Sequence, residues 1–535
     1  MAGAVLMVQG TASSAGKSLT VAGLCRLFAD EGYRVAPFKS QNMSNNAAVT
    51  DEGHEIGRAQ AMQAFAARQA PHVDMNPILL KPEADHRSQV VVMGRALDTV
   101  PAAAYQSMKD VLWGEVTAAL GRLRAANDLV IIEGAGSPAE INLKARDIAN
   151  MRVALHANAP VLLVGDIDRG GVFAHLYGTC ELLDPPEKAL VKGLIINKLR
   201  GDPALLEPGL TMIEGLTGVP VAGVVPWVRG LNLPEEDSVA LDRRSDERGP
   251  SPGLVVAVVR LPRIANFDDF DPLEAEDDVS VRYIDGASGI EHADLVILPG
   301  TKATIADLAW LRERGLAEGI ARAAAAGVPV LGICGGFQML GREIRDPLGV
   351  ESHDAEAAGI GLLEAGTVFH REKHTFQTTG RVAGSAGLLA GMEDMAVRGY
   401  EIHAGVSHAA GVAFESGDGR VLGHRARTAW WWGATCTGSS RTRRSGTPSF
   451  RTSRGCAASA TPLPRGSTTR RASTASRTCC VRRWTCRSST GWSRGSDDGD
   501  VRDRRRAERQ KRLRGAHRGR IRAARDLPRD DGSGG

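Results

Sequence analysis

Several residue types are scarce in this sequence. Aromatic residues make up 4% of its 535 positions, and only three of its eight cysteines, Cys25, Cys180 and Cys334, lie within residues 1–424. Three scattered thiols in so long a stretch exclude a disulfide framework and predict a reducing compartment. No apolar run approaches the roughly 18 residues of a membrane span, and no charged and apolar leader precedes the first glycine-rich loop. We therefore expect a cytoplasmic protein with no membrane partner.

The last 111 residues contain very little lysine and very few large apolar side chains. They contain 27 arginines but one lysine, and only seven of them are Leu, Ile, Val or Phe. Such a segment cannot bury enough apolar surface to offset the entropy lost on ordering, so residues 425–535 are predicted to be disordered. Residues 1–424 contain 54 acidic and 38 basic residues, so the overall charge of +4 comes from the tail. The acidic body gives no reason to expect a nucleic-acid partner.

Short apolar segments alternate with amphipathic helical patterns over most of the chain. This alternation predicts two α/β domains with parallel sheets, at residues 1–235 and 253–424, joined by a charged, proline-containing linker at 236–252. A single helix is expected at 312–327. The segments expected to contain strands are 4–9, 33–38, 128–136, 160–168, 191–202 and 219–227 in the first domain, and 254–262, 293–302 and 328–332 in the second.

A glycine-rich loop, GTASSAGKS, lies between the first expected strand and the first expected helix. Gly10 and Gly16 permit a tight turn in which backbone N–H groups, including that of Thr11, surround phosphate oxygens; Lys17 neutralises charge and Ser18 can bind Mg²⁺. The two glycines are one residue further apart than in the common phosphate loop. This longer form resembles the dethiobiotin-synthetase branch, whose members activate carboxylates with ATP. The alternative is a flexible Gly/Ser turn.

Acidic residues stand at the ends of two further expected strands. Glu133 ends one strand, and Asp166 and Asp168 end the next. Parallel sheets place ligands at the carboxyl ends of their strands, so we expect these carboxylates to take part in Mg²⁺ binding. Solvated carboxylates without a metal are the alternative for each of them.

A second glycine-framed turn, GICGG, follows an apolar segment of the second domain. Cys334 at its centre has the setting of a nucleophile at a strand-to-helix turn, where the helix N-terminus is expected to lower the thiol pKa. Gly300 and Gly335 are candidate donors of oxyanion-hole N–H groups. A buried structural cysteine is the alternative. A thiolate nucleophile needs a base; His403 is available, whereas His424 lies in no recognisable catalytic frame.

An ATP loop joined to a cysteine turn suggests glutamine hydrolysis in one domain and amidation of an activated carboxylate in the other. The chain closely resembles the cobyric acid synthase family of glutamine-hydrolysing amidases, over nearly all of residues 1–424. The motifs that carry the resemblance are PFKSQNMSNNA (37–47), MNPILLKPEADHRSQVVVMG (75–94), EGAGSPAEINL (133–143), DIDRGGVFAHLYGT (166–179), INKLRGD (196–202), LPGTK (298–302), GICGGFQMLG (332–341) and GYEIHAG (399–405).

The resemblance implies the reaction and the residues that serve it. Members of the family amidate the b, d, e and g carboxylates of adenosylcobyrinic acid a,c-diamide with ATP and glutamine, and an acyl phosphate is the expected intermediate. The oligomeric state is not fixed, and a homo-oligomer stays open. The implied residues are Gly10, Thr11, Gly16, Lys17, Ser18 and Asn197 for ATP, Ser18, Glu133 and Asp166 for Mg²⁺, Cys334 as nucleophile, and Asn42, Lys81, Gly300, Gly335 and Gln338 for substrate or oxyanion contacts.

Two other functions share part of this pattern. Cobyrinic acid a,c-diamide synthase has the same two-domain logic with an earlier substrate, but the QNMSNNA run after the second expected strand argues against it. A P-loop ATPase of the partitioning or switch type would share the first loop and the acidic strand ends. Such a protein has no reason to carry GICGGFQ, and dependence of ATP turnover on glutamine separates the two.

The end of the sequence departs from the family. After GYEIHAG the resemblance implies a strand that ends in a TYLHG-like motif containing the catalytic histidine, then a helix; here the histidine is missing and is expected near Thr437. The codons for residues 435–440, TCTGSS, can spell Tyr-Leu-His-Gly-Leu-Phe when regrouped one nucleotide earlier. We therefore expect a frameshift, genuine or a sequencing error, between about residues 420 and 430, with the last strand and helix lost. A basic arm for nucleic acid or another anionic surface is the alternative for the tail.

Overall fold

The computed structural model describes residues 2–84, 86–228, 253–352, 354–383, 389, 392–425 and 431–434. The chain divides into two compact units, Met1–Ser489 and Thr490–Gly535, and the second lies wholly outside the described residues. The expected linker at 236–252 and most of the segment expected to be disordered, 425–535, also lie outside them. None of the helices in the described ranges is long and apolar enough to cross a membrane.

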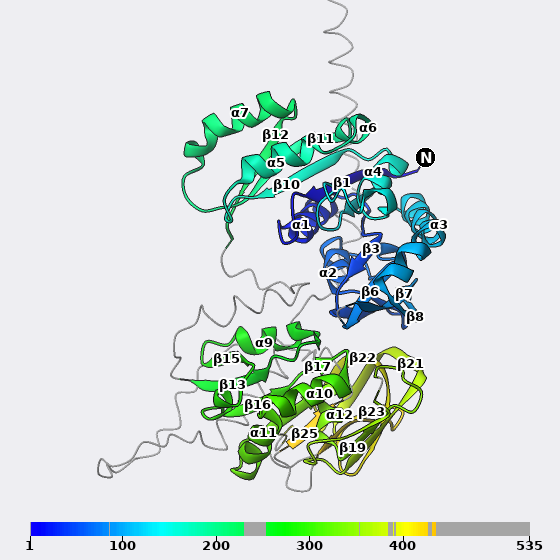
Figure 1. The fold of residues 1–535 in the computed structure, drawn as a ribbon, viewed down its shortest axis with the longest axis vertical. Coiled ribbons are helices and arrows are strands. Elements are labelled where there is room, and N and C mark those ends of the chain that lie inside the picture. The colour runs from blue at the N-terminus through cyan, green and yellow to red at the C-terminus, as the bar shows by residue number, and fades with distance from the viewer. Residues whose placement is uncertain are drawn as a thin grey trace, which may run out of the picture. The chain divides into compact units, whose positions relative to one another are not determined.

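A parallel sheet forms the centre of the first domain, drawn in blue to green in Figure 1. Its order is β12-β11-β10-β1-β9-β2 among the described residues, and all neighbouring strands are parallel. Each strand coincides with a segment predicted as one. The strands are β1 (Ala4–Gly10), β2 (Val35–Phe38), β9 (Leu129–Glu133), β10 (Val161–Asp166), β11 (Val191–Leu199) and β12 (Val221–Pro226).

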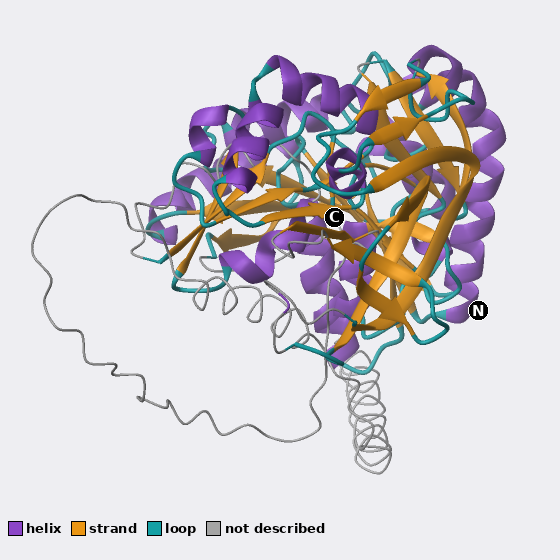
Figure 2. Ribbon diagram, turned by 90° about the horizontal axis from the view of Figure 1, so that it is seen from below, coloured by secondary structure: helices purple, strands orange, loops and turns teal. Residues whose placement is uncertain are grey.

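Helices pack on both faces of this sheet, and Figure 2 shows them around its strands. Successive side chains of a strand point to opposite faces. Thus Val8 packs with Val21 and Cys25 of α1, whereas Met7 packs in the core cluster that holds α3 and α5. The helices are α1 (Lys17–Asp30), α2 (Arg58–Ala66), α3 (Ala102–Ala126), α4 (Met151–Ala157), α5 (Val172–Glu181), α6 (Pro185–Lys188) and α7 (Glu207–Thr217).

Two small sheets between β2 and α3 were not predicted from the sequence. One has the order β3-β6-β7-β8 and the other pairs β4 with β5. Their short strands alternate poorly and are interrupted by prolines and polar residues, so periodicity did not reveal them. These strands are β3 (Gln41–Met43), β4 (Ala47–Val49), β5 (Glu55–Gly57), β6 (Ile78–Ala84), β7 (Arg87–Val92) and β8 (Arg95–Pro101).

A mixed sheet of eleven strands, counted over the described residues, organises the second domain. Its order is β15-β13-β16-β18-β25-β24-β23-β21-β19-β20, with β22 paired to β21, and the first five strands are parallel. The strands are β13 (Leu254–Val259), β15 (Val279–Ile284), β16 (Leu295–Leu298), β18 (Val330–Ile333), β19 (Glu343–Arg345), β20 (Glu356–Ala358), β21 (Ala365–Val382), β22 (Ala396–Ala409), β23 (Val412–Ser416), β24 (Val421–Arg425) and β25 (Trp431–Ala434). A separate pair is β14 (Ile264–Ala265) with β17 (Gly300–Thr301).

The helix predicted at 312–327 is two helices. They are α10 (Thr304–Glu313) and α11 (Leu316–Ala325), and Gly315 between them has a φ of 65°. A glycine takes this left-handed conformation without the steric cost of a Cβ, so the chain turns there instead of continuing the helix. The remaining helices of the second domain are α9 (Asp271–Glu274) and α12 (Gly335–Leu340).

The structure corrects the expectation that the last strand of the second domain is missing. β25 pairs in parallel with β18, with Val330 opposite Trp431, and runs antiparallel to β24. The domain therefore continues past the predicted end at residue 424. A run of tryptophans has a high strand propensity, and the edge of β18 offers backbone groups to pair. The position of the expected histidine, near Thr437, and the expected final helix lie outside the described residues.

Candidate functional site

The side-chain amide of Asn197 is hydrogen-bonded to the glycine-rich loop of the first domain. Asn197 donates from Nδ2 to the carbonyl oxygen of Ala15 at 2.9 Å. Gly16 has a φ of 101°, and a Cβ there would lie 2.1 Å from the same Nδ2 atom. Gly16 is therefore required both by the turn and by the close approach of Asn197. Asn197 contacts the loop, as its prediction as an ATP-site residue would need.

Lys17, the first residue of α1, lies across this loop. Its Nζ donates to the carbonyl oxygens of Ala12 and Gly136, each at 2.9 Å, and the residue is only 6% exposed. Gly136 belongs to the EGAG segment that follows β9. The ammonium group thus connects the two loops at the carboxyl end of the sheet, where phosphate oxygens would replace these carbonyls.

Glu133 is the most enclosed acid of this region, at 1% exposed. Its Oε1 accepts from Ser18 Oγ at 2.8 Å and lies 3.0 Å from Lys39 Nζ, and its Oε2 accepts from Gln63 Nε2 at 2.5 Å. Burial alone would raise the pKa of Glu133, but the Lys39 ammonium and these hydrogen bonds lower it below the usual range. The carboxylate is therefore kept ionised beside the phosphate loop.

The oxygen atoms of Ser18 and Glu133 fit a magnesium ion. Mg²⁺ prefers oxygen ligands and keeps several waters, so one hydroxyl and one carboxylate beside a phosphate site suffice. Asp166, the third predicted ligand, instead pairs with Lys198 at 2.8 Å, and Asp168 pairs with Arg200 at 2.7 Å. The described part of the chain contains no cluster of three or more His, Cys, Asp or Glu suited to holding a metal.

Cys334 lies at the strained turn between β18 and α12. Its φ of 48° and ψ of −111° are unusual for a residue with a Cβ, and glycines surround it. A Cβ on Gly336 would lie 2.1 Å from the carbonyl oxygen of Leu298, and one on Gly300 would lie 3.8 Å from Cys334 Cβ. Gly300 thus lies close to Cys334, and Gly335 directly follows it; their role as oxyanion donors stays a prediction.

The expected fall in the thiol pKa is wrong. Burial raises the pKa of Cys334 to about 11, and the Glu351 carboxylate adds to this rise, while the N–H of Gly335 opposes it. The α12 helix has only six residues, so its dipole is weak against these two effects. The thiol instead points to the carbonyl oxygen of Ile402 in β22, with the sulfur 4.0 Å away.

Neither of the two histidines considered from the sequence, His403 and His424, is hydrogen-bonded to the thiol in the described residues. His403 faces an oxygen acceptor at each ring nitrogen, Gly405 O at 2.8 Å and Glu401 Oε2 at 3.1 Å. His424, in β24, stacks on the ring of Phe337 with centroids 5.5 Å apart, and burial lowers its pKa. His424 Nδ1 is buried and has no hydrogen-bond partner in the described part of the chain.

Sequence reasoning missed a buried acid beside the thiol. Glu351 accepts from Thr304 Oγ1 at 3.1 Å, and Gln338 lies next to the same hydroxyl at 3.4 Å. Gln338, predicted as a substrate contact, is 3% exposed and borders β22, because a Cβ on Gly405 would lie 2.5 Å from its Nε2. Glu351 follows a turn without a recognisable motif, so no sequence signal identified it.

Asn42 and Lys81, which were predicted to contact the substrate, are each bonded to another side chain of the first domain. Asn42 is 2% exposed and donates to Gln60 Oε1 at 3.0 Å. Lys81 is 4% exposed and its Nζ lies 2.5 Å from Glu55 Oε1. Neither side chain is presented on an open surface in this structure.

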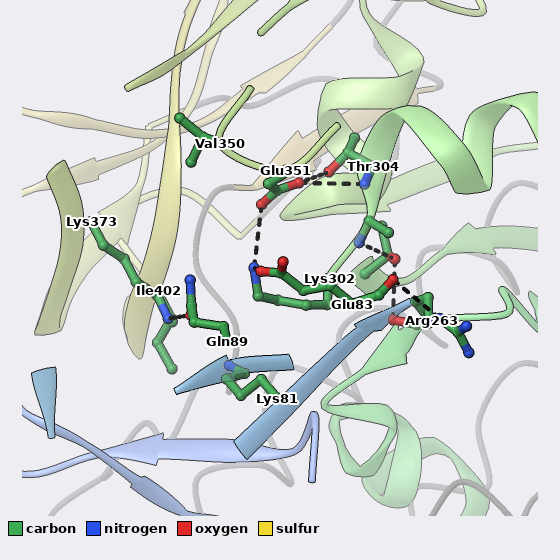
Figure 3. A network of polar contacts seen from close by, with 12 residues as sticks. Lys81, Glu83, Gln89, Arg263, Lys302, Thr304, Val350, Glu351, Lys373 and Ile402 are labelled. Carbon is green, nitrogen blue, oxygen red and sulfur yellow. Dashed lines mark hydrogen bonds and ion pairs between the residues drawn. The ribbon is translucent and has the colours of Figure 1, made fainter. Parts of the chain in front are cut away.

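Figure 3 shows a buried network of charges that joins the small sheet of the first domain to the second domain. Lys373 of β21 lies 2.6 Å from Glu55 Oε2 and donates to Gln89 Oε1 at 2.9 Å. Lys302 lies 2.6 Å from Glu83 Oε1 and 4.0 Å from Glu351 Oε1. Burial would raise the pKa of Glu55, but the two ammonium groups beside it lower it to about 2.

Asparagine side chains make a reciprocal contact elsewhere between the domains. Asn46 Oδ1 accepts from the backbone N–H of Asn266 at 2.7 Å, and Asn266 Oδ1 accepts from the N–H of Ala47 at 2.9 Å. Asn266 has a φ of 53°, a conformation that asparagine tolerates better than most residues. Asn46 belongs to the QNMSNNA run, so part of this motif holds the two domains together.

The fold and these two sites define a class of protein: a P-loop nucleotide-binding domain joined to a class I glutamine amidotransferase domain. The family models agree with both halves. Residues 6–239 match the CobQ/CobB/MinD/ParA nucleotide binding domain, and residues 255–426 match the CobB/CobQ-like glutamine amidotransferase domain.

Curated relatives narrow the class to one family. The chain is 58% identical to the cobyric acid synthase of Desulforudis audaxviator over 413 residues, which cover 77% of this chain and 81% of that protein. It is 56% identical to the cobyric acid synthase of Sorangium cellulosum over 416 residues, 76% of this chain and 80% of the relative. The chain belongs to the cobyric acid synthase family, whose members are glutamine-dependent amidating ligases.

Proposed function

We propose that this chain amidates the b, d, e and g carboxylates of adenosylcobyrinic acid a,c-diamide, with ATP as the activating substrate and ammonia as the attacking nucleophile. The observation that carries the proposal is the pairing of a phosphate loop that has an ionised acid beside it with a cysteine turn in a second domain of the same chain. The family membership of the chain supports the choice of substrate.

The first half of the reaction activates the carboxylate. A substrate carboxylate oxygen attacks the γ-phosphorus of ATP, ADP leaves, and an acyl phosphate forms. Lys17 would donate to phosphate oxygens in place of the two carbonyls that it contacts now. Ser18 and Glu133 would hold Mg²⁺, which neutralises phosphate charge when it is bound. Ammonia then attacks the acyl carbon and phosphate leaves, which yields the amide.

The second half supplies ammonia from glutamine, and we propose that it is impaired in this chain. Cys334 would attack the amide carbon of glutamine, with the N–H groups of Gly300 and Gly335 near the developing oxyanion; the C–N bond then breaks to release ammonia, and water hydrolyses the thioester to give glutamate and the free thiol. Its raised pKa leaves little thiolate at neutral pH, and His403 already faces an oxygen acceptor at each ring nitrogen. Ammonium ions in solution bypass this step, because the first domain holds its own site.

A frameshift near residues 420–430 remains our explanation for the missing histidine. Its support is the codon pattern of residues 435–440, which can spell the family motif in the neighbouring frame. Sequencing the gene across this region tests the explanation directly. A downstream alternative frame that closes within a few codons would contradict it.

The experiment that tests the function compares two nitrogen sources. Purified protein is incubated with ATP, Mg²⁺ and adenosylcobyrinic acid a,c-diamide, and mass spectrometry follows successive amide formation. We expect amidation with ammonium chloride and little with glutamine. Lys17→Met should abolish the ammonium reaction, whereas Cys334→Ala should leave it unchanged. Absence of any ATP-dependent amidation with ammonium, from protein that binds ATP, would contradict the proposed function.

A further inference from the structure

Helix α2, Arg58–Ala66, touches both candidate sites although it belongs to neither motif. It is nine residues long, and most of its side chains are buried. A helix of this length is stiff and spans roughly 13 Å, at about 1.5 Å per residue. Arg58 and Gln63 lie five residues apart on it, so their polar contacts move together if the helix shifts.

The C-terminal half of α2 contacts the nucleotide site through Gln63. Gln63 donates from Nε2 to Glu133 Oε2 at 2.5 Å and to the backbone oxygen of Ser18 at 3.2 Å. The Oε1 atom of the same amide is buried and has no hydrogen-bond partner in the described part of the chain. Gln63 is therefore bonded to the same two residues, Ser18 and Glu133, that would hold a cation beside the phosphate loop.

The other end reaches the second domain. Arg58 donates from Nη2 to the Tyr400 hydroxyl at 2.5 Å, and its Nε lies 2.9 Å from Asp268 Oδ2. Its guanidinium also lies against the Tyr400 ring, 5.3 Å from the centroid. Arg58 therefore makes three contacts with the second domain: with the Tyr400 hydroxyl, the Tyr400 ring and Asp268. A shift of α2 would change these contacts.

Tyr400 lies on the strand that borders the thiol. It is two residues before Ile402 in β22, and the Ile402 carbonyl oxygen is 4.0 Å from Cys334 Sγ. Residues two apart in a strand share a face and a rigid backbone. Glu133 is thus connected to Ile402 by the hydrogen bonds of Gln63 and Arg58 and by the backbone segments of α2 and β22 that lie between these residues.

We propose that α2 transmits occupancy of the ATP site to the glutaminase thiol, with Gln63 as the sensing residue and Arg58 as the positioning residue for β22. The inference rests on the proposed function, because it takes MgATP as the ligand of the first site. It assigns to α2 the task of making ammonia release depend on activation of the carboxylate. Such coupling requires an element with contacts to both sites, and α2 supplies them.

The test measures the reactivity of Cys334 in the full chain, which needs no glutaminase turnover. Iodoacetamide modification of the Cys334 peptide is followed by mass spectrometry, with and without Mg²⁺ and a non-hydrolysable ATP analogue. We expect the analogue to change the modification rate of the wild-type chain at least about threefold. Tyr400→Phe, which removes only the hydroxyl, and Arg58→Met should abolish that change while a fluorescent ATP analogue still binds with unchanged affinity.

Arg68→Met is the matched control. Arg68 follows α2 and pairs with Asp30 at 2.6 Å, within the first domain. This variant should keep the wild-type response. The inference is overturned if the wild-type rate does not respond to the analogue, or if Tyr400→Phe and Arg58→Met, shown to be folded by circular dichroism, respond as the wild type does. Failure of the wild-type chain to bind the fluorescent ATP analogue would instead contradict the proposed function.

Discussion

The two candidate sites of this chain differ in how far their parts are assembled. At the nucleotide site, Ser18, Lys39 and Gln63 already surround an ionised Glu133. At the thiol site, burial and Glu351 raise the pKa of Cys334 to about 11. The described contacts of the first site come entirely from residues before the second domain. Under the proposed frameshift, the second site lacks a histidine near residue 437, so we expect the change to affect glutamine hydrolysis and to spare carboxylate activation.

Restoring the alternative frame should remove this difference, and it has the largest expected effect. A chain whose residues after about 425 are translated in the neighbouring frame regains Tyr-Leu-His-Gly near position 437. A positioned general base contributes about 10²–10⁴-fold, so glutamine-dependent amidation should rise by that factor. The measurement is the amidation rate with glutamine as the only nitrogen source.

Ammonium-dependent amidation is the internal control for the restored chain. It should stay within about twofold, since the first domain is untouched. Replacing the restored histidine by alanine should return the glutamine rate to that of the present chain. A restored chain with no gain in glutamine-dependent rate would contradict the assignment of the missing base.

The pH dependence of Cys334 modification should show the second-largest effect. A raised pKa keeps the thiol protonated, so thiolate is scarce below pH 11 and increases about tenfold per pH unit up to it. A free cysteine has a pKa of about 8.5, so at pH 8 Cys334 should react about two orders of magnitude more slowly. Peptide-resolved iodoacetamide kinetics between pH 7 and 11 measure the midpoint.

Glutathione under the same conditions provides the comparison thiol. A Cys334 midpoint below about pH 9 would contradict the raised pKa and return the thiol to the state expected from the helix N-terminus.

Motifs with a local cause were predictable from the sequence. The glycine loop between β1 and α1 and the glycines around Cys334 are each dictated by turns or close approaches within a few residues. The parallel strands followed from short apolar segments bounded by turn residues. Local geometry therefore accounts for the positions of Lys17 and Ser18 at the start of α1 and of Cys334 directly after β18.

Long-range partners were not predictable in the same way. Nothing near Lys81 in the sequence indicates Glu55, and nothing near Asn46 indicates Asn266. The predicted fall in the pKa of Cys334 was wrong for the same reason. Burial and the Glu351 carboxylate depend on the tertiary fold, and together they raise the pKa more than the dipole of the six-residue helix lowers it. We did not predict strand β25, because we expected out-of-frame residues to form no strand beside β18. Strand pairing uses backbone hydrogen bonds, which many side chains allow, so β25 pairs with β18.

The asparagine contact between the domains should have a moderate effect on stability. Asn46→Ala leaves the buried N–H of Asn266 without its acceptor, which costs about 1–3 kcal/mol. Urea unfolding followed by tryptophan fluorescence measures the change in the free energy of unfolding. Asn142→Ala, at an exposed position, is the control and should change it by less than about 0.5 kcal/mol. Equal values for the two variants would show that the contact contributes little.

Neutralising Glu351 should have the smallest effect of these changes. It should lower the pKa of Cys334 and so make the thiol site slightly more reactive. The Glu351 carboxylate raises the pKa of Cys334, so Glu351→Gln removes one cause while burial, the largest, and the Asp269 carboxylate remain. We expect the modification midpoint to move to lower pH and the rate at pH 8 to increase about three- to tenfold.

Glu343→Gln provides the control for that substitution, because Glu343 is exposed and pairs with Arg345 at 2.6 Å. It should leave the Cys334 midpoint unchanged. If Glu351→Gln also leaves it unchanged, the Glu351 carboxylate does not contribute to the raised thiol pKa, and burial is its main cause. The contrast between the sites would then follow from enclosure of the sulfur, and only a change that opens the contact between Cys334 and Ile402 could reduce it.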